Sequence, residues 1–137
     1  MASVLSTPWQ TGGMPISGCM NIHSVSLTVP SAGVVLVIST AHLWIDHTSG
    51  TPDTWDFLNA NSATDCSLGD PSRLQYIGNM PSDDATGLYD MSGTVVSTFV
   101  VGGAGTVTFY LNVMMLAGAS GNDIVSEAST VAVFYPS

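Results

Sequence analysis

Basic side chains are almost absent from this sequence. Its 137 residues contain one arginine, Arg73, and no lysine, against ten acidic residues, which gives a formal net charge of −9. Because proteins bind phosphate backbones by displacing counterions with several Lys or Arg side chains, this chain is not expected to bind nucleic acid. Anionic membrane surfaces attract basic segments for the same reason, so membrane binding is not expected either.

Long hydrophobic runs are also missing. The longest, VVLVI at 34–38, has five residues, whereas a membrane-spanning helix needs roughly 20. The first residues, MASVLSTPWQ, have neither the basic nor the apolar region of a secretory signal. Two explanations stay open: a signal was removed and replaced by an initiator methionine, or the protein is made in the cytoplasm, as a virus or phage structural protein is. In both cases the expected location is extracellular or the surface of an extracellular particle.

Cysteine occurs only twice, at Cys19 and Cys66. In an extracellular domain the two could form one disulfide that closes a loop of about 50 residues and stabilises the fold by about 3–4 kcal/mol on the chain-entropy model. The alternative is two buried free thiols, which are common in protein cores. The sequence does not decide between them, because it does not give the distance between the two side chains.

The dominant pattern in the sequence is the alternation of apolar and polar residues with a period of two. Hydrophobic residues make up 45% of the chain and charged residues only 8%. In HSVSLTV (23–29) every second residue is apolar, which is the alternation of a half-buried β-strand. No segment combines a helical period with paired caps. Strands are expected at seven segments: 23–29, 34–46, 54–60, 73–79, 94–101, 106–118 and 130–137.

These strands predict one all-β domain. Turn sequences such as PSAG (30–33) and GGAG (102–105) separate them, and many short strands at this spacing favour a sandwich. The expected fold is a jelly-roll β-sandwich of about eight to ten antiparallel strands. It spans residues 1–137 as a single domain, and residues 1–21 form an N-terminal arm or the first edge strand.

Three segments resemble parts of a known superfamily. LTVPSAGVVLVISTAHLWI resembles the strand–turn–strand unit in the globular heads of the complement and tumour-necrosis-factor jelly-roll superfamily. FVVGGAGTVTFYLNV resembles its later hairpin and STVAVFYPS its last strand, while WIDHTSGTPD is similar to a segment of uncharacterised bacterial extracellular β-sandwich domains. The resemblance covers most of residues 22–136. It implies a jelly roll that often assembles as a trimer and works by recognition rather than catalysis.

The segment AHLWIDHTSGTPD (41–53) is a candidate metal or catalytic site, because it holds two of the three histidines. On a strand, His42 and Asp46 would share a face but lie about 13 Å apart, too far to ligate one ion. The segment is therefore expected to end a strand and enter a turn, with His47 hydrogen-bonded locally. No Gly-x-Ser-x-Gly motif is present, so the sequence predicts no enzyme, no catalytic residues and no transition-metal site.

Calcium is the one cofactor that the sequence leaves open. The segment SDDATGLYD (82–90) offers the carboxylates of Asp83, Asp84 and Asp90, together with backbone carbonyls. The alternative is an ordinary acidic surface loop that binds no ion.

Self-association is expected from the two C-terminal strands. In 106–118 and 130–137 both faces carry large apolar side chains, whereas a monomer would bury only one face. The expected function is that of a non-enzymatic, self-assembling structural or adhesive module, with a further copy of the chain as its partner. The alternative is a carbohydrate- or protein-binding head domain of a fibre or virion, whose partner is a glycan or a cell-surface protein. The expected interface residues are Met114, Leu116, Phe134 and Tyr135. The candidate ligand-binding residues are Trp44, Trp55 and Tyr89, and the alternative for these aromatic side chains is a place in the core of the sandwich.

Overall fold

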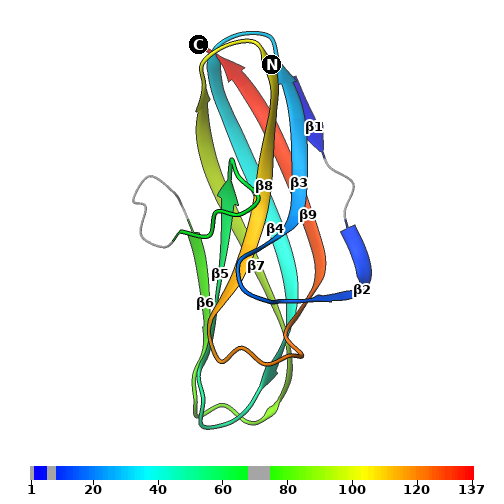
Figure 1. The fold of residues 1–137 in the computed structure, drawn as a ribbon, viewed down its shortest axis with the longest axis vertical. Helices are drawn as coiled ribbons and strands as arrows, with labels where there is room; N and C mark the ends of the chain where they lie inside the picture. Colours follow the sequence, from blue (N-terminus) through cyan, green and yellow to red (C-terminus); the bar gives the residue numbers. More distant parts are fainter. Residues whose placement is uncertain (1, 6–8, 68–74) are drawn as a thin grey trace.

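Two antiparallel sheets pack face to face in the computed structural model, which describes residues 2–5, 9–67 and 75–137 (Figure 1). The five-stranded sheet has the order β1-β9-β4-β7, with β2 also paired to β9, and the four-stranded sheet has the order β3-β8-β5-β6. Within the described ranges no helix is long and apolar enough to cross a membrane. The strands are β1 (Ala2–Leu5), β2 (Trp9–Pro15), β3 (Met20–Val29), β4 (Gly33–His47), β5 (Asp53–Ala60), β6 (Gln75–Met80), β7 (Gly87–Val101), β8 (Gly105–Ala117) and β9 (Ile124–Pro136).

The strand order is that of a jelly roll. Strands β1 and β2 pair with successive parts of β9, so together they act as one first strand. Counted in this way, the two sheets have the orders 1-8-3-6 and 2-7-4-5. The chain changes sheet at almost every connection, and of the described strands only β5 and β6 are neighbours both in the chain and in a sheet. The predicted all-β jelly-roll sandwich is confirmed.

Two strands are longer than the sequence predicts. Strand β7 begins at Gly87 rather than at residue 94, and β9 begins at Ile124 rather than at residue 130. Polar outward positions such as Asp90 make the first part of β7 resemble a loop in composition, although its backbone pairs with β4 throughout. The first two residues of the predicted strand 73–79 lie outside the described residues.

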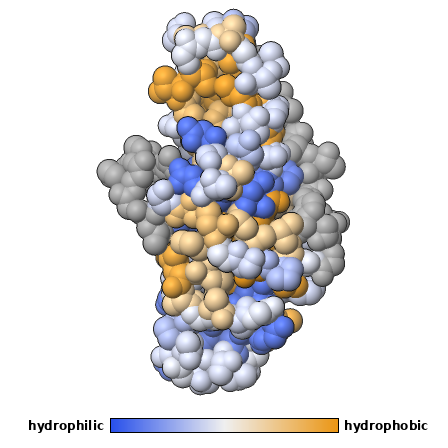
Figure 2. All heavy atoms as spheres, in the orientation of Figure 1, coloured by the Kyte–Doolittle hydropathy of each residue, from blue (hydrophilic) through white to orange (hydrophobic). Residues whose placement is uncertain are grey.

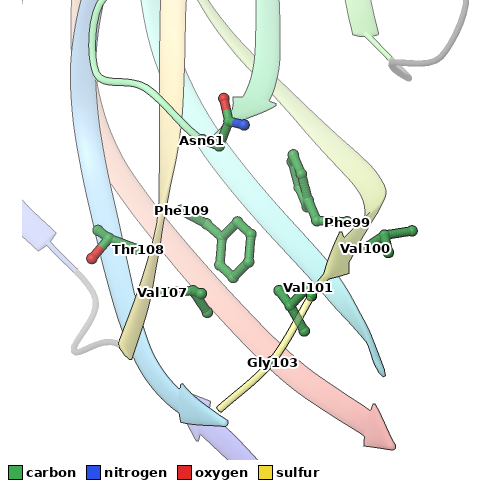
Figure 3. A pocket seen from close by; sticks show the side chains of 9 residues that line it. Asn61, Phe99, Val100, Val101, Gly103, Val107, Thr108 and Phe109 are labelled. Atoms are coloured by element: carbon green, nitrogen blue, oxygen red, sulfur yellow. The ribbon is translucent and has the colours of Figure 1, made fainter. Parts of the chain in front are cut away.

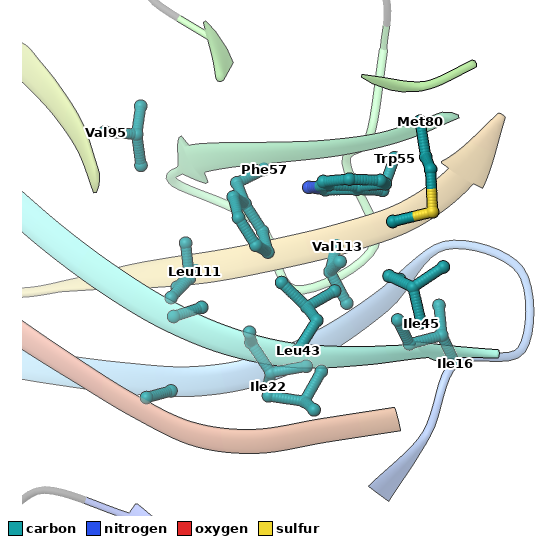
Figure 4. Close-up of a cluster of buried hydrophobic side chains, with 13 residues drawn as sticks. Ile16, Ile22, Leu43, Ile45, Trp55, Phe57, Met80, Val95, Leu111 and Val113 are labelled. Atoms are coloured by element: carbon teal, nitrogen blue, oxygen red, sulfur yellow. The ribbon is translucent and has the colours of Figure 1, made fainter. Parts of the chain in front are cut away.

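Two hydrophobic clusters fill the space between the sheets. The larger contains Leu43, Trp55 and Phe57 (Figure 4). The smaller contains Phe109 and Phe134 and lies toward the end of the sandwich that carries both termini (Figure 1). Inward side chains of both sheets contribute to each cluster, as expected for the interior of a sandwich.

A buried polar layer lies between the two clusters. The side chain of Asn59, which is fully buried, donates to the carbonyl oxygens of Val37 at 3.2 Å and Val95 at 3.3 Å. It also accepts a hydrogen bond of 2.6 Å from the hydroxyl of Ser39, whose oxygen lies 3.1 Å from that of Thr130. Because a buried polar group is costly only when it lacks a partner, this layer is compatible with a stable core.

Candidate functional site

Residues 41–53 run along β4 and into a turn, as the sequence predicts. Burial alternates along β4, so that His42, Trp44 and Asp46 share the outer face of the five-stranded sheet. In the turn, Gly50 has a φ of +99°, a conformation that favours glycine. Across the described part of the chain, no three His, Cys, Asp or Glu side chains are grouped so that they could hold a metal ion.

His47 points inward at the end of β4 and has no exposed surface. Its Nδ1 is hydrogen-bonded to Oδ2 of Asp53, which is also buried and begins β5. The ring meets the ring of Tyr89 edge-on, with centroids 6.1 Å apart, and its Nε2 has no hydrogen-bond partner in the described structure. A carboxylate also orients the imidazole in catalytic dyads, but a substrate has no access to this ring. The pair therefore ties β4 to β5.

A polar hollow of about 460 Å³ lies at this end of the sandwich, lined by residues that include Asp46, Asp53 and Ser120. Beside it, the buried carboxylate of Asp123 accepts hydrogen bonds from the backbone N–H groups of Asp46 at 3.0 Å and Ser120 at 2.8 Å. Burial raises the pKa of Asp123, these hydrogen bonds oppose the rise, and the charge of Asp53 adds to it. The two hydrogen bonds to Asp123 hold the β8–β9 loop against β4. His47 does not line the hollow.

The three calcium candidates are divided between a turn and a strand, and among the described residues they are not part of any group of three metal-ligating side chains. Asp83 and Asp84 lie in the turn between β6 and β7, where the N–H of Asp84 donates to the carbonyl of Pro81 at 3.3 Å. Asp90 lies on β7, and its Oδ1 is 4.0 Å from Nδ1 of His42. The physical reason is the early start of β7, which extends the chain between the two parts of the motif.

The aromatic candidates for ligand binding occupy different environments. Trp55 is only 1% exposed, and a side chain at Gly78 would overlap its ring, so this prediction is wrong: Trp55 belongs to the core. Tyr89 is half-buried against the larger cluster and donates from its hydroxyl to the carbonyl of Ala85 at 2.7 Å. Trp44 is 42% exposed on the outer face of β4 and is the one of the three that is open to a ligand.

A disulfide joins Cys19 and Cys66, so of the two alternatives for these cysteines the structure has the bridge. The bridge fixes residues 61–67 across the outer face of the four-stranded sheet. The fully buried side chain of Asn112 on β8 holds the same segment, because it donates to the carbonyls of Ser62 at 2.9 Å and Asp65 at 2.7 Å. We call residues 61–67 the cover segment.

Two of the predicted interface residues are engaged within their own chain. Phe134 is 1% exposed and belongs to the smaller core cluster, so it is wrong as an interface residue. Met114 is half-buried and packs on a cluster that contains Leu58 of β5 and Cys66 of the cover segment, so its own chain covers part of its side chain. Leu116 is half-buried, and Tyr135 is 46% exposed on the outer face of the five-stranded sheet. Sequence alternation showed which residues share a face, but not which face is inside.

Asp56 is a buried carboxylate that sequence reasoning missed. It lies on β5 with 1% exposure, and neither oxygen has a hydrogen-bond partner in the described structure. This burial raises the pKa of Asp56 from 3.8 to about 6. The sequence TWDFLNA gave no signal of it, because an aspartate in an alternating strand is expected to face water.

The outer face of the five-stranded sheet is apolar over the half that lies toward the termini. Strand register places Val34 between Val100 and Tyr135 in one row, and the next two rows are also mainly aliphatic. Beyond these rows the same face becomes polar, beginning at Thr40. We call the following residues the apolar face: Val34, Leu36, Ile38, Val96, Val100, Val131, Val133 and Tyr135, of which Val34, Val96, Val100 and Tyr135 are 37%, 40%, 86% and 46% exposed.

An apolar hollow of about 400 Å³ opens beside this face, where β7 and β8 meet (Figure 3). Phe99 and Phe109 lie across from each other in it, with ring centroids 4.7 Å apart. The hollow forms because β5 ends at Ala60, opposite Tyr110, while β8 continues beyond that point. Hydrophobic side chains gather near this end of the molecule in the view of Figure 2.

No protein-family model matches this chain, and no curated protein matches it either.

Proposed function

We propose that this protein is a non-enzymatic structural or adhesive module that assembles with copies of itself. The observation that carries the proposal is the apolar face, which combines at least three adjacent strands and four side chains with exposures of 37–86%. Contiguous exposed apolar surface of this kind marks interaction sites in soluble proteins. A second copy would remove it from water at about 25 cal/mol per Å².

Charge supports a contact of this type. With a formal charge of −9 and a single arginine, two copies repel each other wherever their acidic residues meet. The apolar face has no ionisable side chain other than the tyrosine hydroxyl of Tyr135, so copies can meet there without bringing carboxylates together. Such a contact depends on burial of hydrophobic surface rather than on ion pairs.

A catalytic role has less support. The His47–Asp53 pair has the bonding of a catalytic dyad, but His47 is fully buried and does not face the polar hollow. The side chain of another histidine, His23, is engaged by Thr130, whose hydroxyl oxygen lies 3.2 Å from the His23 Nδ1.

We also propose a superfamily and a cellular location for this protein. The jelly-roll strand order supports membership of the complement and tumour-necrosis-factor superfamily, for which a trimer is the first assembly to test. The disulfide supports a location outside the cell or on an extracellular particle, because disulfides persist in oxidising environments.

The test is a pair of neutral substitutions on the same sheet. Val133→Asn places an amide within the apolar face, whereas Leu88→Asn replaces a 63% exposed side chain at the other end of the sheet. We expect Val133→Asn to weaken self-association about tenfold or more, and Leu88→Asn to leave it unchanged. Equal association of both variants and the wild type, measured by sedimentation equilibrium on proteins with native circular dichroism, would reject the apolar face as the contact.

A second candidate function rests on Trp44. This exposed indole lies opposite Asp90 on β7 and next to His42, a combination of aromatic and polar groups that suits the stacking of a sugar ring. The candidate is a carbohydrate-binding head domain. Glycan-array binding that is lost in Trp44→Ala would establish it.

A further inference from the structure

Strand β7 is an unprotected edge of the five-stranded sheet. It pairs with β4 over its whole length from Gly87 to Val101, without a register shift, and in the described part of the chain no strand pairs with its other side. Every second residue of an edge strand directs its backbone N–H and C=O away from the sheet. With 15 residues, β7 is also much longer than the usual strand.

Devices that normally protect such an edge are missing from most of β7. Natural proteins place lysine, proline, bulges or inward charges on exposed edges to prevent pairing with another chain. From Met91 to Val101 the strand has no charged residue and no proline, and Asp90 is the one charged residue in β7. In a chain with a net charge of −9, this is a long neutral stretch of free backbone.

Apolar side chains flank the free backbone on both sides of the sheet. On the outer side Val96 and Val100 are 40% and 86% exposed and belong to the apolar face. On the inner side Phe99 and Val101 line the apolar hollow together with Phe109 (Figure 3). An added strand would therefore gain backbone hydrogen bonds and cover apolar surface at the same time.

We propose that β7 of one copy pairs antiparallel with β7 of a second copy over residues 93–101, which joins two five-stranded sheets into one continuous sheet. The inference rests on the proposed self-assembly and adds to it a contact between sheet edges, which extends the apolar face across two copies and leaves that face free for a further contact. An isologous contact requires a surface that is complementary to itself, and this stretch meets that requirement because it is neutral. With the two-fold axis at Ser97, Gly93 lies opposite Val101 of the second copy.

The same axis explains why a second copy fits better than a charged partner strand. Antiparallel pairing about an axis perpendicular to the sheet keeps the outer faces of both copies on one side, so the two apolar faces become continuous. Each outward valine then meets threonine: Val96 lies opposite Thr98 of the second copy, and Val100 opposite Thr94. Both copies of Asp90 lie beyond the paired stretch, so no carboxylates meet across the new ladder.

The test combines hydrogen exchange with one matched pair of variants. Amides of residues 93–101 should exchange more slowly at concentrations where the wild type self-associates than at concentrations where it is monomeric. Thr98→Lys places a charge at the centre of the proposed ladder, and Thr28→Lys places the same charge at an exposed outward position of β3 in the other sheet. We expect Thr98→Lys to weaken the dimer at least tenfold and Thr28→Lys to associate like the wild type.

The outcomes separate this inference from the proposed function. If the wild type associates, Thr98→Lys associates equally well and exchange of residues 93–101 does not change, the edge contact is wrong while self-assembly stands. If the wild type stays monomeric at every concentration, both are wrong. Should Thr98→Lys fail to give a native circular dichroism spectrum, Val100→Lys at the 86% exposed position takes its place, with the same expected loss of the dimer.

Discussion

Ser39 and Asn59 connect the two sheets through the interior of the sandwich, where the hydroxyl of Ser39 donates to the amide oxygen of Asn59 at 2.6 Å. Both side chains are buried, and Asn59 also donates to backbone carbonyls of the facing sheet. Hydrogen bonds require a particular geometry, whereas the aliphatic and aromatic side chains that make up most of the core do not. Together with the His47–Asp53 and His23–Thr130 contacts, which also join the two sheets, this contact restricts how the sheets are aligned.

Replacement of Asn59 by leucine should destabilise the protein by about 2–4 kcal/mol, because it leaves the Ser39 hydroxyl and two carbonyls with fewer partners in a dry interior. The double variant Asn59→Leu/Ser39→Ala should recover part of this loss, since both partners are then apolar. Asn79→Leu, at an exposed position of β6, is the control and should change the free energy of unfolding by less than about 1 kcal/mol. Urea unfolding measures all three, and equal effects at the two asparagines would contradict the proposed role of the layer.

Gly78 is required by the position of the Trp55 ring. A Cβ atom at residue 78 would lie 2.1 Å from the indole, whereas one at Gly102 would have no neighbour within 4 Å. We expect Gly78→Ala to lower the free energy of unfolding by about 1–3 kcal/mol or more, the cost of overpacking a core. Gly102→Ala should have little effect. Thermal unfolding followed by tryptophan fluorescence compares the two, and a fully stable Gly78→Ala would show that Trp55 packs elsewhere.

Loss of the Cys19–Cys66 disulfide should destabilise the fold and release the cover segment. The bridge spans 47 residues of sequence, and the chain-entropy model assigns about 4 kcal/mol to a loop of this size. The Cys19→Ser/Cys66→Ser protein should melt roughly 10 °C lower than the oxidised wild type, because 1 kcal/mol corresponds to about 2–4 °C or more at this length. Reductant should lower the melting temperature of the wild type and leave that of the double variant unchanged; an equal response of both would argue against the bridge.

Asp56 should make the protein less stable as pH rises from about 4 to about 6. Burial raises its pKa from 3.8 to about 6, so in this range the folded state holds a proton that the unfolded state has lost, and the free energy of unfolding falls with pH. Asp56→Asn should be more stable than the wild type by about 1–2 kcal/mol at pH 7 and equally stable at pH 4. Burial of Asp123 raises its pKa too and keeps part of the slope in both proteins.

Asp83→Asn is the matched control for that measurement, because Asp83 lies exposed in the β6–β7 turn. Its unfolding free energy should follow the wild-type pH profile. An Asp56→Asn profile parallel to that of the wild type would mean that the carboxylate of Asp56 is solvated.

The period of two in the sequence was sufficient to predict the fold class. It placed strands at β3, β4 and β8 to within a few residues, because one face of each is buried and the other is not. It failed for the first part of β7, which is an edge strand with an exposed, polar outer side. It also missed residues 124–129, which pair with β2 although their composition resembles a loop.

The candidate site was less predictable, because it depends on which face each strand buries. Strand β9 is apolar on both sides, and only the structure shows that Phe134 lies inside while Tyr135 lies outside. Strand β5 is buried on both sides: Leu58 and Ala60 pack with Cys66 of the cover segment, whereas Trp55 packs in the cluster between the two sheets. Alternation along the sequence does not reveal a strand that is covered on both faces, which explains why Asp56 was missed. His47 was predicted to be hydrogen-bonded locally at a turn, and the structure shows that it is fully buried and bonded to Asp53, a partner that the sequence did not indicate.

Sedimentation velocity of the wild-type protein over a wide concentration range, at low and high salt, tests the central claim of self-assembly through apolar surface most directly. We expect a concentration-dependent shift from monomer to a defined oligomer. Association should be no weaker at about 0.5 M salt than at about 0.05 M, since salt screens the repulsion between acidic copies and does not weaken hydrophobic contacts. A single monomeric species at every concentration and both salt levels would contradict it.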